Sequence, residues 1–146
     1  MNRLALCATL LVLGMASMNE AILCHEPQPQ VGDWVLNEYD GKECVSLVKE
    51  LCPGMHDYDT SFWRRGEKVK SNCRTIPRLT PIATFLASDN TYEGHAAIFD
   101  TCDSDGLWVY DQWNETGKYL KRRKVPYGYR VPSYNGDNFY VIELQR

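Results

Sequence analysis

The fold is decided by the segment at residues 41–54, which reads GKECVSLVKELCPG. Its apolar residues Val45, Val48 and Leu51 follow one another at the spacing of a single helix face. A proline and a glycine come soon after the apolar run, and these residue types end helices. The segment therefore predicts a short amphipathic helix, and it places Cys44 in the first turn of that helix.

The residues after this helix predict strands that can pair with one another. Short apolar runs bounded by turn residues are typical of strands. Four such runs occur, at Ile82–Phe85, His95–Asp100, Leu107–Trp113 and Phe139–Leu144. Residues 22–32 predict an extended segment, and residues 56–78 and 114–136 predict irregular structure. A helix followed by strands predicts an α+β fold, with the helix packed on an antiparallel sheet.

The N-terminal residues predict a signal peptide rather than part of the fold. A basic start precedes a run of about 12 apolar residues at positions 4–15. That run is shorter than the roughly 20 residues that a membrane-spanning helix needs. Small residues follow, and cleavage is expected after Ala16 or Ala21. We therefore expect residues 1–21 to be a signal peptide, residues 22–146 to form a single domain, and the mature protein to be secreted and extracellular.

The composition excludes several classes of protein. Of the 146 residues, 44% are hydrophobic and 24% are charged, which is ordinary for a soluble globular chain. The formal net charge of −3 argues against a nucleic-acid partner and against attraction to an anionic membrane. No Cys-x-x-Cys or His-x-x-x-His spacing occurs, so the sequence predicts no metal site and no cofactor. No later stretch is long and apolar enough to predict a membrane span.

Cys44 and His95 predict the nucleophile and the base of a hydrolase. A cysteine at a helix N-terminus lies at the positive end of the helix dipole, beside unpaired N–H groups, and both lower the pKa of its thiol. The resulting thiolate is a nucleophile, and a nearby imidazole completes the pair. His95 opens a predicted strand after Gly94. His25 and His56 are weaker candidates, because they lie in the extended segment and after a Pro-Gly loop.

A third polar residue must orient the imidazole, and two neighbours compete for this role. In the third predicted strand, Asp111 shares a face with apolar Leu107 and Val109 because alternate residues point the same way. If that face packs on the helix that carries Cys44, Asp111 is a lone carboxylate beside the site and Gln112 points away. We therefore expect Asp111 to orient the imidazole, with Gln112 as the alternative.

Each of these residues also has a purely structural interpretation. A secreted cysteine such as Cys44 is often half of a disulfide. A lone histidine such as His95 is more often a surface or structural residue, and Asp111 can end a strand ladder. The order of helix-terminal cysteine, strand-initial histidine and polar strand residue is nevertheless typical of papain-type hydrolases, whose partners are distant in sequence.

Five segments of the chain resemble one known family. They read GKECVSLVKEL (41–51), FWRRGEKV (62–69), TPIATF (80–85), GHAAIFD (94–100) and VYDQW (109–113). On these segments the chain is similar, over about residues 31–144, to the family-two amidase effectors of bacterial type VI secretion. With its signal peptide it resembles the domesticated, tick-type amidase effectors that arthropods acquired by gene transfer. These proteins belong to the NlpC-like and CHAP-like branch of peptidoglycan hydrolases, so the resemblance implies a papain-like fold.

The resemblance also implies a function. It implies a secreted cysteine amidase that hydrolyses peptide crosslinks of bacterial peptidoglycan, between D-alanine and meso-diaminopimelate, with no cofactor or metal. Cys44 matches the nucleophile, His95 matches the general base, and Asp111 lies in the DQW segment where the third residue is expected. Such an enzyme serves antibacterial innate immunity. Its partner is peptidoglycan, and we expect a monomer.

Two other functions fit parts of the pattern. A papain-like protease acting on proteins would use the same residue types, but the Cys-Gly-Ser-Cys-Trp signature of that branch is absent around Cys44. A non-catalytic binding protein would keep the fold and lose the chemistry. Alkylation of the thiol distinguishes these functions, because a binding module has no activity to lose.

The cysteine count predicts two disulfides and one free thiol. The sequence encodes six cysteines, and Cys7 leaves with the signal peptide. The remaining five enter an oxidising compartment, where thiols pair, so one is left over. Because a nucleophile must stay reduced, we expect the two disulfides among Cys24, Cys52, Cys73 and Cys102. Of the three possible pairings, we favour Cys52–Cys73 together with Cys24–Cys102.

Two basic tracts, Arg64–Lys70 and Lys118–Lys124, admit two interpretations. A run of like charges is usually a solvated surface, but it also attracts anionic wall polymers. A separate motif, Asn114-Glu115-Thr116, is a glycosylation sequon that makes Asn114 a candidate for modification. It follows the third predicted strand, where a glycan would crowd the cleft.

Overall fold

The computed structural model describes residues 20–145, so the predicted signal peptide lies outside the described residues except for positions 20 and 21. The elements are α1 (Cys44–Leu51), β1 (Trp63–Lys68), α2 (Val69–Asn72), β2 (Pro81–Thr84), β3 (Ala96–Cys102), β4 (Gly106–Asp111), β5 (Lys121–Pro126) and β6 (Phe139–Leu144). Short 3-10 turns lie at Gln28–Gln30, Thr60–Phe62, Pro132–Tyr134 and Gly136–Asn138. In the described range, no helix combines the length and the apolar character that crossing a membrane requires.

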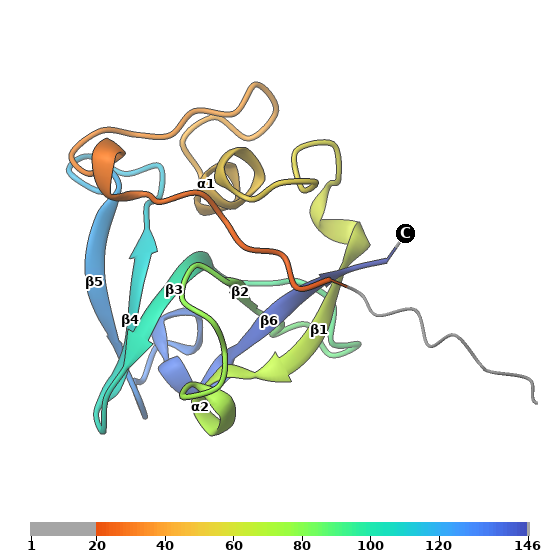
Figure 1. The fold of residues 1–146 in the computed structure, drawn as a ribbon, viewed down its shortest axis with the longest axis vertical. Coiled ribbons are helices and arrows are strands. Elements are labelled where there is room, and N and C mark those ends of the chain that lie inside the picture. Colours follow the sequence, from red (N-terminus) through yellow and green to blue (C-terminus); the bar gives the residue numbers. More distant parts are fainter. Residues whose placement is uncertain (1–19, 146) are drawn as a thin grey trace, which may run out of the picture.

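The strands form one antiparallel sheet in the order β1-β6-β2-β3-β4-β5 (Figure 1). The last strand of the chain, β6, lies between β1 and β2. Ile82 of β2 pairs with Ala97 of β3 on one side and with Val141 of β6 on the other. Because β2 is central and both faces of the sheet are covered, all of its residues are buried. A continuous apolar run is typical of such a strand.

The two helices cover opposite faces of the sheet (Figure 1). Leu47 of α1 packs with Ile98 and Tyr110 in one apolar cluster, which we call the α1-side cluster. Val69 of α2 packs with Phe99 in the α2-side cluster. Side chains of β3 alternate between the two clusters, as the strand geometry requires. The predicted α+β class, with the cysteine-bearing helix packed on an antiparallel sheet, is confirmed.

The four predicted strands are present, and most of their ends differ from prediction by one or two residues. β6 has the predicted bounds. β3 begins at Ala96, so His95 precedes the strand instead of opening it. β4 ends at Asp111, two residues before the predicted end. Strand ends are the least certain part of a sequence pattern, because the apolar run and the hydrogen-bonded ladder do not stop at the same residue.

β1 and β5 lie in segments that the sequence predicts to be irregular, and that prediction is wrong. The two strands read WRRGEK and KRRKVP, and both lie at edges of the sheet. An edge strand has one unpaired row of backbone groups, and charged side chains there oppose pairing with another chain. An edge position therefore favours the same charged residues that make these strands hard to predict from the sequence.

The paired cysteines are the four expected, but the favoured pairing is wrong. The structure joins Cys24 to Cys52 and Cys73 to Cys102. The N-terminal arm is hydrogen-bonded to the last residue of α1, which brings Cys24 beside Cys52. Cys73 and Cys102 pack on the α2-side cluster, on the other face of the sheet from Cys52. Among the described cysteines, Cys44 is free and buried.

Candidate active site

Cys44 is the first residue of α1 and is 7% exposed. Because Cys44 begins the helix, its N–H has no carbonyl partner one turn earlier within the helix. The helix dipole is positive at this end. Glu43 precedes Cys44 in an extended conformation and makes no side-chain cap. The sulfur therefore lies where backbone N–H groups stabilise negative charge.

His95 is held directly before β3 and is 2% exposed. Its N–H donates to Oγ1 of Thr84, at 2.9 Å. Gly94 has a φ of +113°, and a Cβ at this position would collide with the side chain of Thr84. Position 94 therefore requires glycine. The hydrogen bond between Thr84 and His95 fixes the backbone from which the imidazole extends.

The His95 ring is bounded by a carboxylate and two aromatic rings. Its Nε2 lies 2.8 Å from Oδ2 of Asp111, which is completely buried. The other carboxylate oxygen of Asp111 accepts a hydrogen bond from Nε of Arg123. The ring centroids of Tyr134 and Trp113 lie 5.0 Å and 5.7 Å from that of His95. These contacts fix the orientation of the imidazole and use its Nε2, so Nδ1 is the ring nitrogen that Asp111 does not bind.

Cys44 and His95 shift each other's titration. Burial raises the pKa of the Cys44 thiol. A hydrogen bond with His95, the charge of His95, and hydrogen bonds from Tyr92 and the Ala96 N–H have the opposite effect. Together they outweigh burial, so the pKa of Cys44 is lowered. Burial lowers the pKa of His95, but hydrogen bonds with Asp111 and Cys44 and the charges of both raise it to about 9. Both shifts favour a thiolate beside an imidazolium.

Tyr92 is a site residue that the sequence reasoning missed. Its hydroxyl oxygen lies 3.5 Å from Sγ of Cys44. Its ring packs edge to face on Trp63, with the centroids 5.0 Å apart. Burial, and then the charge of Cys44, raise the pKa of Tyr92, so the hydroxyl keeps its proton and donates to the thiolate. The available signal was its position three residues before His95, with a glycine between them.

Asp111 contacts His95, but the premise from strand alternation is wrong. Leu107 and Val109, which share the face of Asp111, pack in the α2-side cluster and not against α1. The residue of β4 that packs on the α1 side is Tyr110. Asp111 therefore reaches His95 from the face of the sheet opposite α1, at the end of β4.

Gln112 faces away from His95 and binds the backbone around the start of α1. Its Oε1 accepts from the N–H of Val35, at 2.9 Å, and its Nε2 donates to the carbonyl of Val35, at 2.8 Å. The same Nε2 also donates to the carbonyls of Lys42 and Glu43, at 3.2 Å and 3.3 Å. Gln112 thus positions the chain that leads to Cys44, and it is not the partner of the imidazole.

Arg123 is a second residue that the sequence reasoning missed. It lies in the basic tract Lys118–Lys124, where its role depends on the strand register. Arg123 of β5 pairs with Val109, two positions before Asp111 on β4, so its guanidinium reaches the buried carboxylate. No local pattern marks this one arginine among its basic neighbours.

The remaining candidates lie outside this group. Asn114 is exposed in the loop after β4. His56 is exposed and contacts Glu50 and Asp57. A cavity of about 600 Å³ lies on the α2 side, with Tyr127 among its lining residues, and it includes none of Cys44, His95 and Asp111. The candidate site is therefore the region around the start of α1.

Comparisons with known proteins identify the family of this chain. The family model described as "Domesticated amidase effector 2" matches residues 13–142. The chain is 57% identical over 138 residues to "Domesticated amidase effector 2" of Ixodes scapularis, covering 94% of this chain and 95% of that protein. It is 28% identical over 118 residues to "Type VI secretion amidase effector 2 protein" of Salmonella typhi, covering 69% of this chain and 84% of that protein.

A solved structure shares the fold. The structure of "Type 6 secretion amidase effector 2" superposes with a TM-score of 0.66 at 23% sequence identity, covering 84% of this chain and 95% of that one. At this identity the match concerns the fold alone, whereas the family model spans most of the sequence. The chain belongs to the domesticated amidase effector 2 family.

Proposed function

We propose that this protein is a secreted cysteine amidase that hydrolyses peptide bonds of bacterial cell-wall peptidoglycan. The observation that carries the proposal is the pair of His95 and the buried Asp111, 2.8 Å apart, together with a free Cys44 whose thiol pKa His95 lowers. The names of its relatives, which are amidase effectors, support an amide as the bond that is cut. Two disulfides are typical of extracellular proteins and support secretion.

In the first half of the reaction the Cys44 thiolate attacks the carbonyl carbon of the substrate amide. The carbonyl oxygen becomes an oxyanion, which the N–H groups at the start of α1 stabilise. The protonated His95 then gives its proton to the amide nitrogen, the carbon–nitrogen bond breaks, and the amine leaves. An acyl group remains on the sulfur of Cys44 as a thioester.

In the second half a water molecule replaces the amine. Neutral His95 removes a proton from the water as the oxygen attacks the thioester carbon. The carbon–sulfur bond breaks, the acid product leaves, and Cys44 returns as a thiolate beside a protonated His95. Asp111 keeps the imidazole in one orientation through both halves and stabilises its positive charge. Arg123 holds Asp111 in place and is a positioning residue.

We propose the crosslink between D-alanine and meso-diaminopimelate as the bond that is cut, on the resemblance to the bacterial effectors. The test is to incubate purified muropeptide dimers of known stem chemistry with the protein and identify the products by mass spectrometry. Hydrolysis of the crosslink releases two monomers, and the new carboxyl group lies on D-alanine. Cleavage within a stem would give different masses and would refute the choice of bond.

The same assay tests the catalytic residues. Cys44→Ala is expected to abolish cleavage and His95→Ala to be nearly as damaging, because removal of one member of a catalytic pair removes most of the rate acceleration. Circular dichroism checks that both variants are folded, and Tyr39→Phe, at a position that is 75% exposed, is the matched control. Substantial cleavage by folded Cys44→Ala would refute the cysteine mechanism. Cleavage of casein in preference to muropeptides would point to a protease that acts on proteins.

We also propose that Asn114 carries an N-linked glycan when the protein is made in a eukaryotic secretory pathway. The side chain is exposed, and the sequon requires a surface loop. Asn114 directly follows Trp113, whose ring contacts His95. A mass difference that disappears in Asn114→Gln would support the modification, and an unmodified mass for the secreted protein would exclude it.

A further inference from the structure

Three lysines near the candidate active site lie over aromatic rings. The distances from Nζ to the ring centroid are 4.3 Å for Lys42 over Trp34, 5.1 Å for Lys118 over Trp113, and 4.5 Å for Lys121 over Tyr119. We call these six residues the lysine–aromatic surface. A cation over a ring keeps its charge, and an ammonium group has three donors, so each lysine can still bind an anion.

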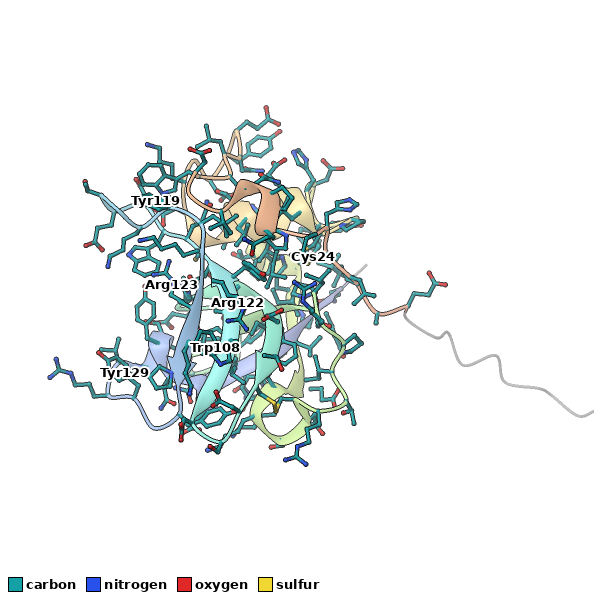
Figure 2. The ribbon with its side chains drawn as sticks, turned by 60° about the vertical axis from the view of Figure 1, so that its left-hand side comes forward. Cys24, Trp108, Tyr119, Arg122, Arg123 and Tyr129 are labelled. Carbon is teal, nitrogen blue, oxygen red and sulfur yellow. A yellow bond between two sulfur atoms is a disulfide. The ribbon has the colours of Figure 1, made fainter. Side chains whose placement is uncertain are left out.

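These lysines differ from their neighbours because they have no acidic partner. Within the described part of the chain, none of the three takes part in an ion pair, although the rest of the basic tract does. The pairs are Arg122 with Asp100, Arg123 with Asp111, and Lys124 with Asp103 and Asp105. Figure 2 shows Tyr119 and Arg123 toward the left of the molecule, and Arg122 and Trp108 nearer its centre. The tract is therefore divided between structural cations and two unpaired lysines.

The lysine–aromatic surface is continuous. Nε1 of Trp34 donates to the carbonyl of Trp113, at 3.3 Å. The rings of Trp34 and Tyr119 meet edge to face, with the centroids 5.8 Å apart. Glu115 accepts a hydrogen bond from Nε1 of Trp113, at 2.9 Å, and is thus used by the indole and not by a lysine. Three lysine charges and one carboxylate, that of Glu115, therefore lie on one patch of aromatic side chains, which leaves the lysines in excess.

This surface begins at the candidate catalytic residues. The Trp113 ring contacts His95, with the centroids 5.7 Å apart. Lys42 lies two positions before Cys44, and Gln112 binds its carbonyl. The surface therefore adjoins the residues at which a substrate amide bond would lie.

We propose that the lysine–aromatic surface is a subsite for the carboxylate groups of the substrate beside the bond that is cut. This inference rests on the proposed peptidoglycan amidase function. In a crosslink to meso-diaminopimelate, the amide nitrogen is attached to a carbon that also bears a free carboxylate. That charge lies close to the scissile bond, where Lys42, Lys118 and Lys121 can pair with it. The aromatic rings cover the apolar part of the same side chain.

The test compares two soluble muropeptide dimers that carry no phosphate. In one the carboxylate beside the crosslink is free, and in the other it is amidated, which removes the charge and keeps the shape. We expect the wild-type protein to have a KM about 10-fold lower for the free carboxylate, since hydrogen bonds between charged groups contribute roughly that much. The kcat values for the two dimers should agree within about twofold if the subsite binds substrate and transition state equally.

The variants locate the effect. Lys118→Gln/Lys121→Gln, and separately Lys42→Gln, should raise KM for the free-carboxylate dimer about 5-fold and leave KM for the amidated dimer unchanged. Lys118→Arg/Lys121→Arg keeps the charge and should retain the preference. The matched control is Lys68→Gln/Arg74→Gln, which loses the same charge at two exposed positions outside the surface.

The outcomes separate the two proposals. Equal KM values for the two dimers with an active wild-type protein would overturn the subsite and leave the proposed function standing. An equal loss in the control would also overturn it, because the effect would then be one of net charge. An effect confined to intact walls that carry phosphate polymers would identify phosphate as the anion, and would overturn it as well. Cleavage of neither dimer by the wild type would refute the proposed function itself.

Discussion

The hydroxyl oxygen of Tyr92 lies 3.5 Å from the sulfur of Cys44, although the two residues are 48 positions apart. Tyr92 comes from the loop before β3, and Cys44 begins α1. His95 comes from the same loop, so one short segment supplies the two side chains that lower the pKa of the thiol. The reactivity of the sulfur therefore depends on how that loop packs against the helix.

Tyr92→Phe tests this dependence. The variant removes the hydroxyl and keeps the ring that packs on Trp63. A hydrogen bond to a charged group contributes roughly 1.5–3 kcal/mol, so we expect the pKa of Cys44 to rise and kcat to fall about 10- to 100-fold. The rate of iodoacetamide alkylation against pH reports the thiol pKa. An alkylation profile identical to that of the wild type would show that the hydroxyl does not act on the sulfur.

Asp111→Asn and Gln112→Ala separate orientation of the imidazole from support of the chain. Asp111→Asn should lower kcat by about 100-fold or more, because a neutral amide no longer fixes and stabilises the imidazolium. Gln112→Ala leaves buried groups of Val35 without partners, so the free energy of unfolding should fall by about 1–3 kcal/mol. Kinetics and urea unfolding are measured on both. A larger loss of kcat at Gln112 would reverse the two roles.

The activity should follow a bell-shaped pH profile. Activity rises with pH as Cys44 ionises, at a pKa below its ordinary value. It falls as His95 loses its proton, at a pKa of about 9. Because folding raises the pKa of His95, its contribution to stability is complete below its ordinary pKa of about 6.5 and is lost as the pH rises through about 9. Measurement of kcat/KM and of thermal melting between pH 5 and 10 tests both effects. An activity that still increases above pH 10 would contradict the assignment.

The two disulfides should differ in their effect on activity. Their cysteines are separated by 28 and 29 positions, so removal of either should cost about 3–4 kcal/mol of stability in the chain-entropy model. Cys24→Ser/Cys52→Ser should also lower kcat, because Cys52 directly follows the helix that carries Cys44. Cys73→Ser/Cys102→Ser is the control, since this bridge lies on the opposite face of the sheet. Equal kcat values for the two double variants would show that α1 does not need its covalent anchor.

Local patterns predict the parts of this fold whose burial is simple. The helix at Cys44 is amphipathic and β6 is a short apolar run, so local sequence patterns predict both elements. β1 and β5 are not, because their charged side chains serve the sheet edge and the ion pairs of their neighbours. The disulfide pairing depends on which face of the sheet each segment crosses. That information is tertiary, and spacing along the chain does not contain it.

The candidate site likewise contains some residues that local sequence patterns predict and others that depend on the tertiary structure. Cys44 and His95 are marked by their positions at a helix start and beside a strand start. The alternation of side chains along the strand favours Asp111 over Gln112, but Asp111 lies on the face of the sheet opposite α1 and not on the α1 face that the prediction assumed. Arg123 is one cation among five in its tract, and the pairing of β5 with β4 is what selects it. Tyr92 is an ordinary aromatic residue until the loop folds back toward α1.

The burial of Cys44 also has a consequence for oxidative folding. A free thiol in a chain that must form two disulfides threatens to pair with the wrong cysteine, and the thiolate is the form that attacks. In an unfolded chain the Cys44 thiol has an ordinary pKa of about 8.5, so only a few per cent is thiolate at neutral pH. The shift toward thiolate requires His95 and Tyr92, which reach the sulfur only when the loop before β3 has docked on α1. Before folding, Cys44 is therefore no more reactive than the other four cysteines of residues 22–146, and its sulfur gains thiolate character only in the step that also encloses it.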